Sequence, residues 1–181
     1  MNSTDPAPRR SWSDPATAAT RIVREALRDS AERMQVANVE AVLRQLQNGD
    51  PSSWGEYQSA VAQHVGAYLE TCDENVKATY IYDNEWSPDQ LSADDNALAP
   101  MIHLIIWAQP KTAALRALID ILNRALALRL GQVVGKLSVA QLLDVQVIDD
   151  SEMSRRSGYA ALLTSSHMRP AQVHKRQAAS A

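Results

Sequence analysis

The sequence predicts an α+β protein: an N-terminal two-helix hairpin followed by a small mixed β-sheet covered by helices. Three observations lead to this fold class. Apolar residues recur at helical spacing over the first third of the chain, three later segments are rich in β-branched, aliphatic and aromatic residues, and a strongly apolar helical segment connects the last two of these. A strand–helix–strand connection implies that those two strands are parallel and that helices cover the sheet.

Size, charge and cysteine content exclude several classes of protein. The chain has 181 residues, a formal net charge of −3 and one cysteine, Cys72. This length suits one domain with a helical appendage, and the charge provides no general attraction to nucleic acid or to an anionic membrane. A single cysteine cannot form an internal disulfide, and no apolar stretch is long enough to span a bilayer. We therefore expect a cytoplasmic protein that does not associate with membranes.

The first long helix is predicted from its start signal and its periodicity. Residues 1–13 show no hydrophobic pattern and are predicted to be a disordered tail. Asp14 precedes a proline, which is typical of a helix N-terminus. Apolar residues then recur at helical spacing as far as Asn48, so we expect one long helix, with one break allowed near Gln35.

A second helix follows after a short turn. Ser53 and Glu56 have the spacing of a capping box, and the apolar pattern continues to about Thr71. Because the turn is short, the two helices should pack antiparallel and form a helical hairpin arm over residues 14–72. This arm has an apolar stripe that must be covered, either by the sheet domain or by a second chain.

The α+β domain is expected over residues 76–168, with a flexible tail at residues 169–181. A helix that begins after Thr112 and ends at Gly131 is apolar almost all round, so we expect it to be mostly buried. Asp149 and Asp150 are expected to end the third strand and cap a final helix, with Ser151 as a further candidate for the cap. The predicted strands are, in order, residues 76–82, 101–110 and 142–148.

One histidine lies inside the most apolar strand. His103 is flanked by Ile102 and Leu104 in a short segment bounded by prolines, which is typical of a strand buried on both faces. Asp144 is predicted on the neighbouring strand, and a buried carboxylate needs a partner. We expect a buried polar pair between His103 and Asp144. A metal-binding or catalytic role for His103 is the alternative, although no histidine spacing indicates a metal site, and the sequence predicts no cofactor.

Two groups of charged residues are candidates for binding a partner. Asp83 and Glu85 lie with Trp86 in an acidic loop, where an exposed tryptophan could anchor another protein. This loop lacks the glycine and the final glutamate of a calcium-binding loop, so a solvated loop is the other interpretation.

The second candidate group comprises the arginines of the first helix. Arg21, Arg24 and Arg28 either form a solvated face, paired with interleaved acids, or contact phosphates of a nucleic acid. The sequence does not favour nucleic acid as a partner, because no aromatic residues interleave with these arginines.

The order of elements over residues 56–162 resembles that of the minimal nucleotidyltransferase family. That family has a Gly-Ser turn after its first strand, Asp-x-Asp on the second and a further Asp on the third. PMIHLIIW resembles the second strand, and DVQVID resembles the third, with Asp144 at the carboxylate position. The resemblance implies a fold that binds magnesium and a nucleoside triphosphate.

The chain departs from this family at most of its motif residues. Asp83-Asn84 replaces the Gly-Ser turn, and Met101 and His103 occupy the two metal-binding positions of the second strand. Magnesium prefers oxygen ligands, which neither side chain offers. The resemblance therefore implies a degenerate member that has retained the fold and lost the site.

Three functions follow as hypotheses. We favour a non-catalytic interaction or assembly protein of the bacterial cytosol that binds another protein chain, either a second copy of itself or part of a larger assembly. A magnesium-dependent protein that binds or transfers nucleotides, with Asp144 in its site, is the first alternative. A protein that binds the nucleic-acid backbone through its arginine-bearing first helix is the second.

Overall fold

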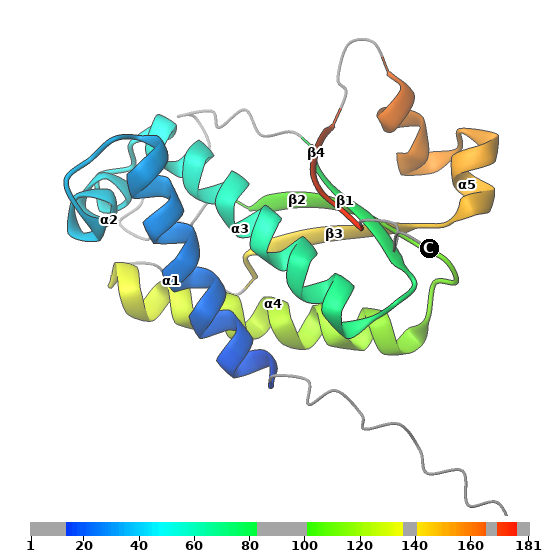
Figure 1. Ribbon diagram of the computed structural model, residues 1–181, viewed down its shortest axis with the longest axis horizontal. Helices are drawn as coiled ribbons and strands as arrows, with labels where there is room; N and C mark the ends of the chain where they lie inside the picture. Colours follow the sequence, from blue (N-terminus) through cyan, green and yellow to red (C-terminus); the bar gives the residue numbers. More distant parts are fainter. Residues whose placement is uncertain (1–13, 83–100, 136–140, 166–169, 177–181) are drawn as a thin grey trace, which may run out of the picture.

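The computed structural model describes residues 14–82, 101–135, 141–165 and 170–176, and it has the predicted α+β fold. One four-stranded sheet lies between a layer of long helices and a smaller helical segment (Figure 1). Among the described helices, none is both long and apolar enough to cross a membrane. The elements are α1 (Pro15–Arg33), α2 (Val39–Gln47), α3 (Pro51–Cys72), β1 (Val76–Tyr82), β2 (Ile102–Ala108), α4 (Ala113–Val134), β3 (Leu143–Ile148), α5 (Asp150–Arg155), the 3-10 helix η2 (Gly158–Thr164) and β4 (Ala171–Lys175).

The sheet is mixed, with strand order β3-β2-β1-β4. Strands β2 and β3 are parallel and are connected by α4, as the sequence predicts. Strand β1 is antiparallel to both β2 and β4. The expected flexible tail at residues 169–181 is therefore wrong in part, because residues 171–175 form an edge strand. Arg176, just after this strand, binds Glu70 and the α3 C-terminus and holds β4 in place.

The N-terminal region forms three helices, because the break allowed near Gln35 is present. Gln35 has a φ of 54°, and the Asn38 side chain caps α2 by accepting a hydrogen bond from the backbone of Ala41. Helix α1 begins after Asp14 as predicted, whereas α3 begins earlier than Ser53: Asp50 is its cap and accepts from the Ser53 backbone at 2.8 Å. A proline directly after an acidic cap explains this earlier start.

One sheet face is covered by α3 and α4, with α1 packed across both helices (Figure 1). A single hydrophobic core joins these helices to the sheet, so the helical arm packs on the sheet domain rather than extending from it. Gly66 allows α3 to approach strands β1 and β4 closely. A Cβ at this position would lie 2.7 Å from His174 Cβ and 2.9 Å from Thr79 Oγ1.

Helix α4 is buried on one side only, so the expectation that it is mostly buried is wrong. Ile121 and Leu128 are 53% and 66% exposed on its outer side. The sheet and α1 cover the opposite side, and no other described helix lies beyond α4. The helix also continues past Gly131 and ends at Gly135, which adopts a left-handed conformation with a φ of 78°.

The other sheet face carries a smaller cover formed by α5 and η2. Asp149, one of the expected capping residues, caps α5 in a capping box with Glu152. Ile105 and Ile148 from the sheet pack there against Ala160 and Leu163. Among the described residues, this cover reaches only part of the face, and His103 at the end of the sheet stays partly exposed.

Candidate functional site

Three side chains form a row across the accessible end of this second face, which we call the polar row. Tyr82 of β1 is opposite His103 of β2, and His103 is opposite Asp144 of β3. Side chains alternate between the two faces of a strand, so direct neighbours in register lie on the same face. The row therefore results directly from strand pairing.

The row is held by hydrogen bonds. His103 Nδ1 lies 3.0 Å from Asp144 Oδ2, and Gln146 Nε2 donates to Asp144 Oδ1 at 3.2 Å. The predicted pairing of His103 with Asp144 is present, but the pair was expected to be buried. Their side chains are instead 29% and 36% exposed, because α5 and η2 cover the other end of this face.

Aromatic rings flank the imidazole on one side. The ring centroids of Tyr82 and His103 are 5.4 Å apart, and those of Tyr82 and Tyr159 are 5.8 Å apart. A carboxylate at Nδ1 favours the tautomer protonated there, which leaves Nε2 as an acceptor.

The polar row does not fit a magnesium site of the kind that the family resemblance implies. Both carboxylate oxygens of Asp144 already accept hydrogen bonds from His103 and Gln146, and its cross-strand neighbours offer no second carboxylate. Within the described ranges, no three His, Cys, Asp or Glu side chains come together as metal ligands. Magnesium binding normally requires several oxygen ligands.

A second polar group on this face connects α5 to the sheet. Lys77 Nζ lies 2.7 Å from both carboxylate oxygens of Asp150, and Trp107 Nε1 donates to Asp150 Oδ1 at 2.7 Å. These hydrogen bonds from Lys77 and Trp107 lower the pKa of Asp150. Asp150 was expected to be a helix cap. It acts as a link between α5 and two strands, which local sequence signals do not reveal.

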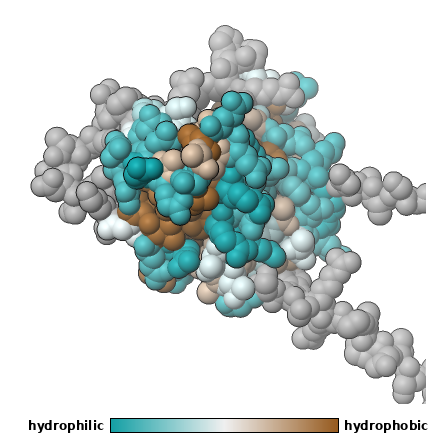
Figure 2. All heavy atoms as spheres, turned by 60° about the vertical axis from the view of Figure 1, so that its left-hand side comes forward, coloured by the Kyte–Doolittle hydropathy of each residue, from teal (hydrophilic) through white to brown (hydrophobic). Residues whose placement is uncertain are grey.

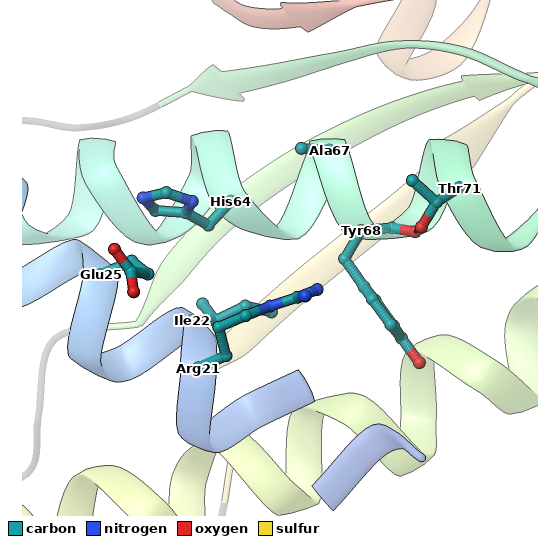
Figure 3. A pocket seen from close by; sticks show the side chains of 7 residues that line it. All are labelled: Arg21, Ile22, Glu25, His64, Ala67, Tyr68 and Thr71. Atoms are coloured by element: carbon teal, nitrogen blue, oxygen red, sulfur yellow. Dashed lines mark hydrogen bonds between the residues drawn. The ribbon is translucent and has the colours of Figure 1, made fainter. Parts of the chain in front are cut away.

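A small pocket lies between α1 and α3 (Figure 3). Its volume is about 250 Å³. Arg21 extends from α1 toward Tyr68 of α3, and burial raises the pKa of the Tyr68 hydroxyl. His64 also lines the pocket, and its Nε2 lies 2.8 Å from Asp29 Oδ2. The lining of the pocket includes one arginine, Arg21, and one glutamate, Glu25, so it does not favour a ligand of either charge.

A larger hollow of about 420 Å³ lies between α1, α2 and α4, and we call it the arginine-rimmed groove. Three of its residues are arginines, and most of the others are aliphatic. Figure 2 shows hydrophobic surface framed by hydrophilic residues on this side of the molecule. The groove is lined by Thr20, Val23, Arg24, Glu25, Leu27, Arg28, Val39, Leu43, Arg129 and Val133.

The residues predicted to bind a partner fall in three places. Arg24 and Arg28 lie on the rim of the groove, and Arg21 lies in the small pocket. Asp83, Glu85 and Trp86 lie outside the described residues. The groove itself was missed because its floor combines residues from three helices. The only local signal was the strongly amphipathic segment that forms α2.

Comparison with known proteins gives no relative: no family model, no curated protein and no solved structure matches this chain.

Proposed function

We propose that the protein is a non-catalytic interaction protein whose arginine-rimmed groove binds an amphipathic helix of another protein. The observation that carries the proposal is an apolar floor bounded by arginines from two helices. Partner helices commonly place their apolar faces in hydrophobic grooves of this kind.

The floor of the groove supports a helical ligand. Val23 and Leu27 of α1 are one turn apart, as are Val39 and Leu43 of α2. Residues four apart lie on the same helix face. Val23 and Leu27 form the buried base of the groove, and the half-buried Val39 and Leu43 present aliphatic surface along it. Val133 of α4 continues this surface. Residues at i, i+3 and i+7 of a bound helix would pack against these aliphatic side chains.

The rim favours an acidic ligand. Arg24 and Arg28 have side chains that are 72% and 59% exposed, and both lie close to Glu25, the one acid among the lining residues. Arg129 Nε is buried without a hydrogen-bond acceptor in the described part of the chain. A buried donor of this kind is stabilised by a ligand that supplies an acceptor. Carboxylates beside the apolar face of the ligand would supply this acceptor. They would also make the groove bind acidic helices in preference to basic ones.

The α1 arginines support nucleic-acid binding less well. Arg24 contacts Glu25, and Arg28 lies within 4 Å of Glu25, Asp29 and Glu32. Asp29 and Glu32 do not line the groove, so they weaken phosphate binding along the outer face of α1 more than binding in the groove itself. Magnesium-dependent nucleotide binding requires several oxygen ligands for the metal, and the described residues of the polar row provide one carboxylate, that of Asp144.

The proposal is tested with two fluorescein-labelled synthetic helices that share a leucine face. One has glutamates beside this face and the other has lysines. Fluorescence anisotropy should detect binding of the glutamate helix alone. Leu43→Glu places a charge in the floor and should weaken this binding at least about tenfold, since burying an unpaired charge is unfavourable.

The matched control is Leu162→Glu, which alters a half-buried leucine of η2 on the other side of the sheet. This variant should bind the glutamate helix as the parent does, and circular dichroism checks that both variants are folded. Equal binding of the two helices, or binding unaffected by Leu43→Glu, would contradict the proposal. Binding of laurate with no binding of either helix would make the groove a lipid site instead.

A further inference from the structure

The outer side of α4 carries an apolar stripe, which we call the α4 stripe and which consists of Leu118, Ile121, Ala125 and Leu128. Leu118 and Ala125 are half-buried and also pack against the core, whereas no described element covers Ile121 and Leu128. Ile121 and Leu128 are more than half exposed, and they are two of the few large apolar side chains of the described chain that are exposed. The opposite side of α4 is the one that enters the core.

The spacing within the stripe is that of a helix–helix seam. Successive members are separated by three, four and three residues, which is the pattern of apolar positions in a heptad repeat. A helix that packs on the sheet with one side normally presents polar residues on the other. Helix α4 instead continues its apolar surface outward to Ile121 and Leu128, beyond the part that the described core covers.

We propose that the α4 stripe is the interface of a homodimer in which two copies of α4 pack antiparallel about a twofold axis near Asn123. The stripe is complementary to itself in this arrangement. Leu118 lies opposite the partner's Leu128, and Ile121 lies opposite the partner's Ala125, so a large side chain meets a small one. Self-complementarity is what a twofold interface requires.

The charges beside the stripe favour the antiparallel orientation. Asp120 and Arg124 lie one turn apart on the same flank. An antiparallel pair brings this flank of each helix together, which forms a neutral set of two aspartates and two arginines. A parallel pair would bring this flank against the opposite flank of the partner helix, so the aspartates and arginines of the two copies would not meet.

This charge pattern also favours a second copy over an unrelated partner, since one surface supplies both the acid and the base. The dimer does not depend on the groove: none of the four stripe residues lines it. The dimer is tested by the mass of the protein in solution, and the groove is tested by peptide binding. Failure of either leaves the other standing.

The experiment is light scattering on the full-length chain over a range of concentrations. A mass of twice 19.9 kDa is expected. Leu128→Glu should give the monomer mass, because two carboxylates would enter an apolar seam. Asp120→Arg places four arginines on the shared flank and should raise the dissociation constant at least about tenfold. The double variant Asp120→Arg/Arg124→Asp restores neutrality and should recover the dimer.

Several outcomes would overturn the proposal. They are a monomer mass for the parent at the highest concentration, a dimer unaffected by Leu128→Glu, and a double variant no better than Asp120→Arg alone. Circular dichroism separates loss of the dimer from loss of the fold.

Cysteine cross-linking tests the orientation separately. Ile121→Cys and Ala125→Cys chains, made with different tags and mixed, should form a disulfide between the two variants, because these positions are opposite in an antiparallel pair. Cys72, the one native cysteine, is buried and should not interfere. Cross-links that form only between two Ile121→Cys chains would indicate a parallel pair and contradict the proposed antiparallel dimer.

Discussion

The two faces of the sheet are covered very differently. One face joins α1, α3 and α4 in a single large core. The other has a small apolar cluster under α5 and η2, and its remaining end carries the polar row. Burial provides most of the stability of a fold. Stability should therefore depend mainly on the first face.

Polar contacts differ between the faces in the same way. On the large-core face, Asn123 is 8% exposed and bonds only to backbone, at the start of β3. On the second face, His103 and Asp144 bond to each other and remain in contact with solvent. A hydrogen bond made without competing water is more consequential to lose. Substitutions on the large-core face should therefore destabilise the fold more than changes at the polar row.

Asn123→Ala should have the largest effect. Asn123 Oδ1 accepts from the backbone nitrogens of Leu142 and Leu143 at 2.9 Å each, and Nδ2 donates to the Leu143 carbonyl at 2.7 Å. The substitution leaves these buried groups unpaired, so the free energy of unfolding should fall by about 3 kcal/mol in urea denaturation. Asn48→Ala, at an exposed position, should change it by less than about 0.5 kcal/mol. Similar values for both would remove the contrast between the faces.

Gly66→Ala should have the next largest effect. The new methyl group would meet His174 and Thr79 at distances below 3.0 Å, so α3 must move away from the sheet, at a cost of about 2 kcal/mol. Gly55→Ala is a matched control in the same helix, where a Cβ has no neighbour within 4 Å. That variant should gain about 0.5–1 kcal/mol from helix propensity. Thermal unfolding of both variants measures the opposite signs, and two changes of the same sign would contradict this packing.

Glu70 provides a pH-dependent effect at the edge of the large-core face. Burial alone would raise its pKa, but hydrogen bonds and positive charge from His174 and Arg176 outweigh burial and lower the pKa below its ordinary value. The ionised carboxylate therefore stabilises the fold above the pKa of an unfolded glutamate, about 4.3. This stabilisation is lost as the pH falls through the lowered pKa.

Urea unfolding of the parent and Glu70→Gln between pH 7 and pH 3 measures this effect. The parent should be the more stable at pH 6, and the difference should disappear toward pH 3. Glu32→Gln, at an exposed position of α1, should show a small difference at every pH. A Glu70 difference that persists at pH 3 would mean that packing, and not charge, holds β4.

The sequence predicted the elements whose signals are local. Asp14 marked the start of α1, and the apolar patterns predicted the ends of β2 and β3 to within a residue or two. His103 and Asp144 could be paired because each is the second residue of its strand, and parallel register then makes them neighbours. Strand periodicity determines which face a residue occupies, and it does so without knowledge of the rest of the fold.

The features that the sequence missed depend on contacts between distant segments. Strand β4 is short, and Arg176 beside it is held by α3 about a hundred residues earlier. The exposure of His103 depends on how far α5 and η2 extend over the sheet, which no pattern around the histidine encodes. The outer side of α4 was expected to be buried because apolar periodicity reports a preference for burial and not the partner that provides it.

The smallest effect should come from magnesium and nucleoside triphosphates. A ligand at a hundred times its dissociation constant stabilises a protein by about 2.7 kcal/mol, which shifts the unfolding midpoint by several degrees. We expect no such shift, in the parent or in Asp144→Ala. Asp144 has both oxygens bonded to side chains of the sheet, and the residue next to it in the polar row is a histidine. A shift in the parent that is lost in folded Asp144→Ala would contradict the non-catalytic function. It would also mean that the accessible sheet face, and not the arginine-rimmed groove, is the functional side of the molecule.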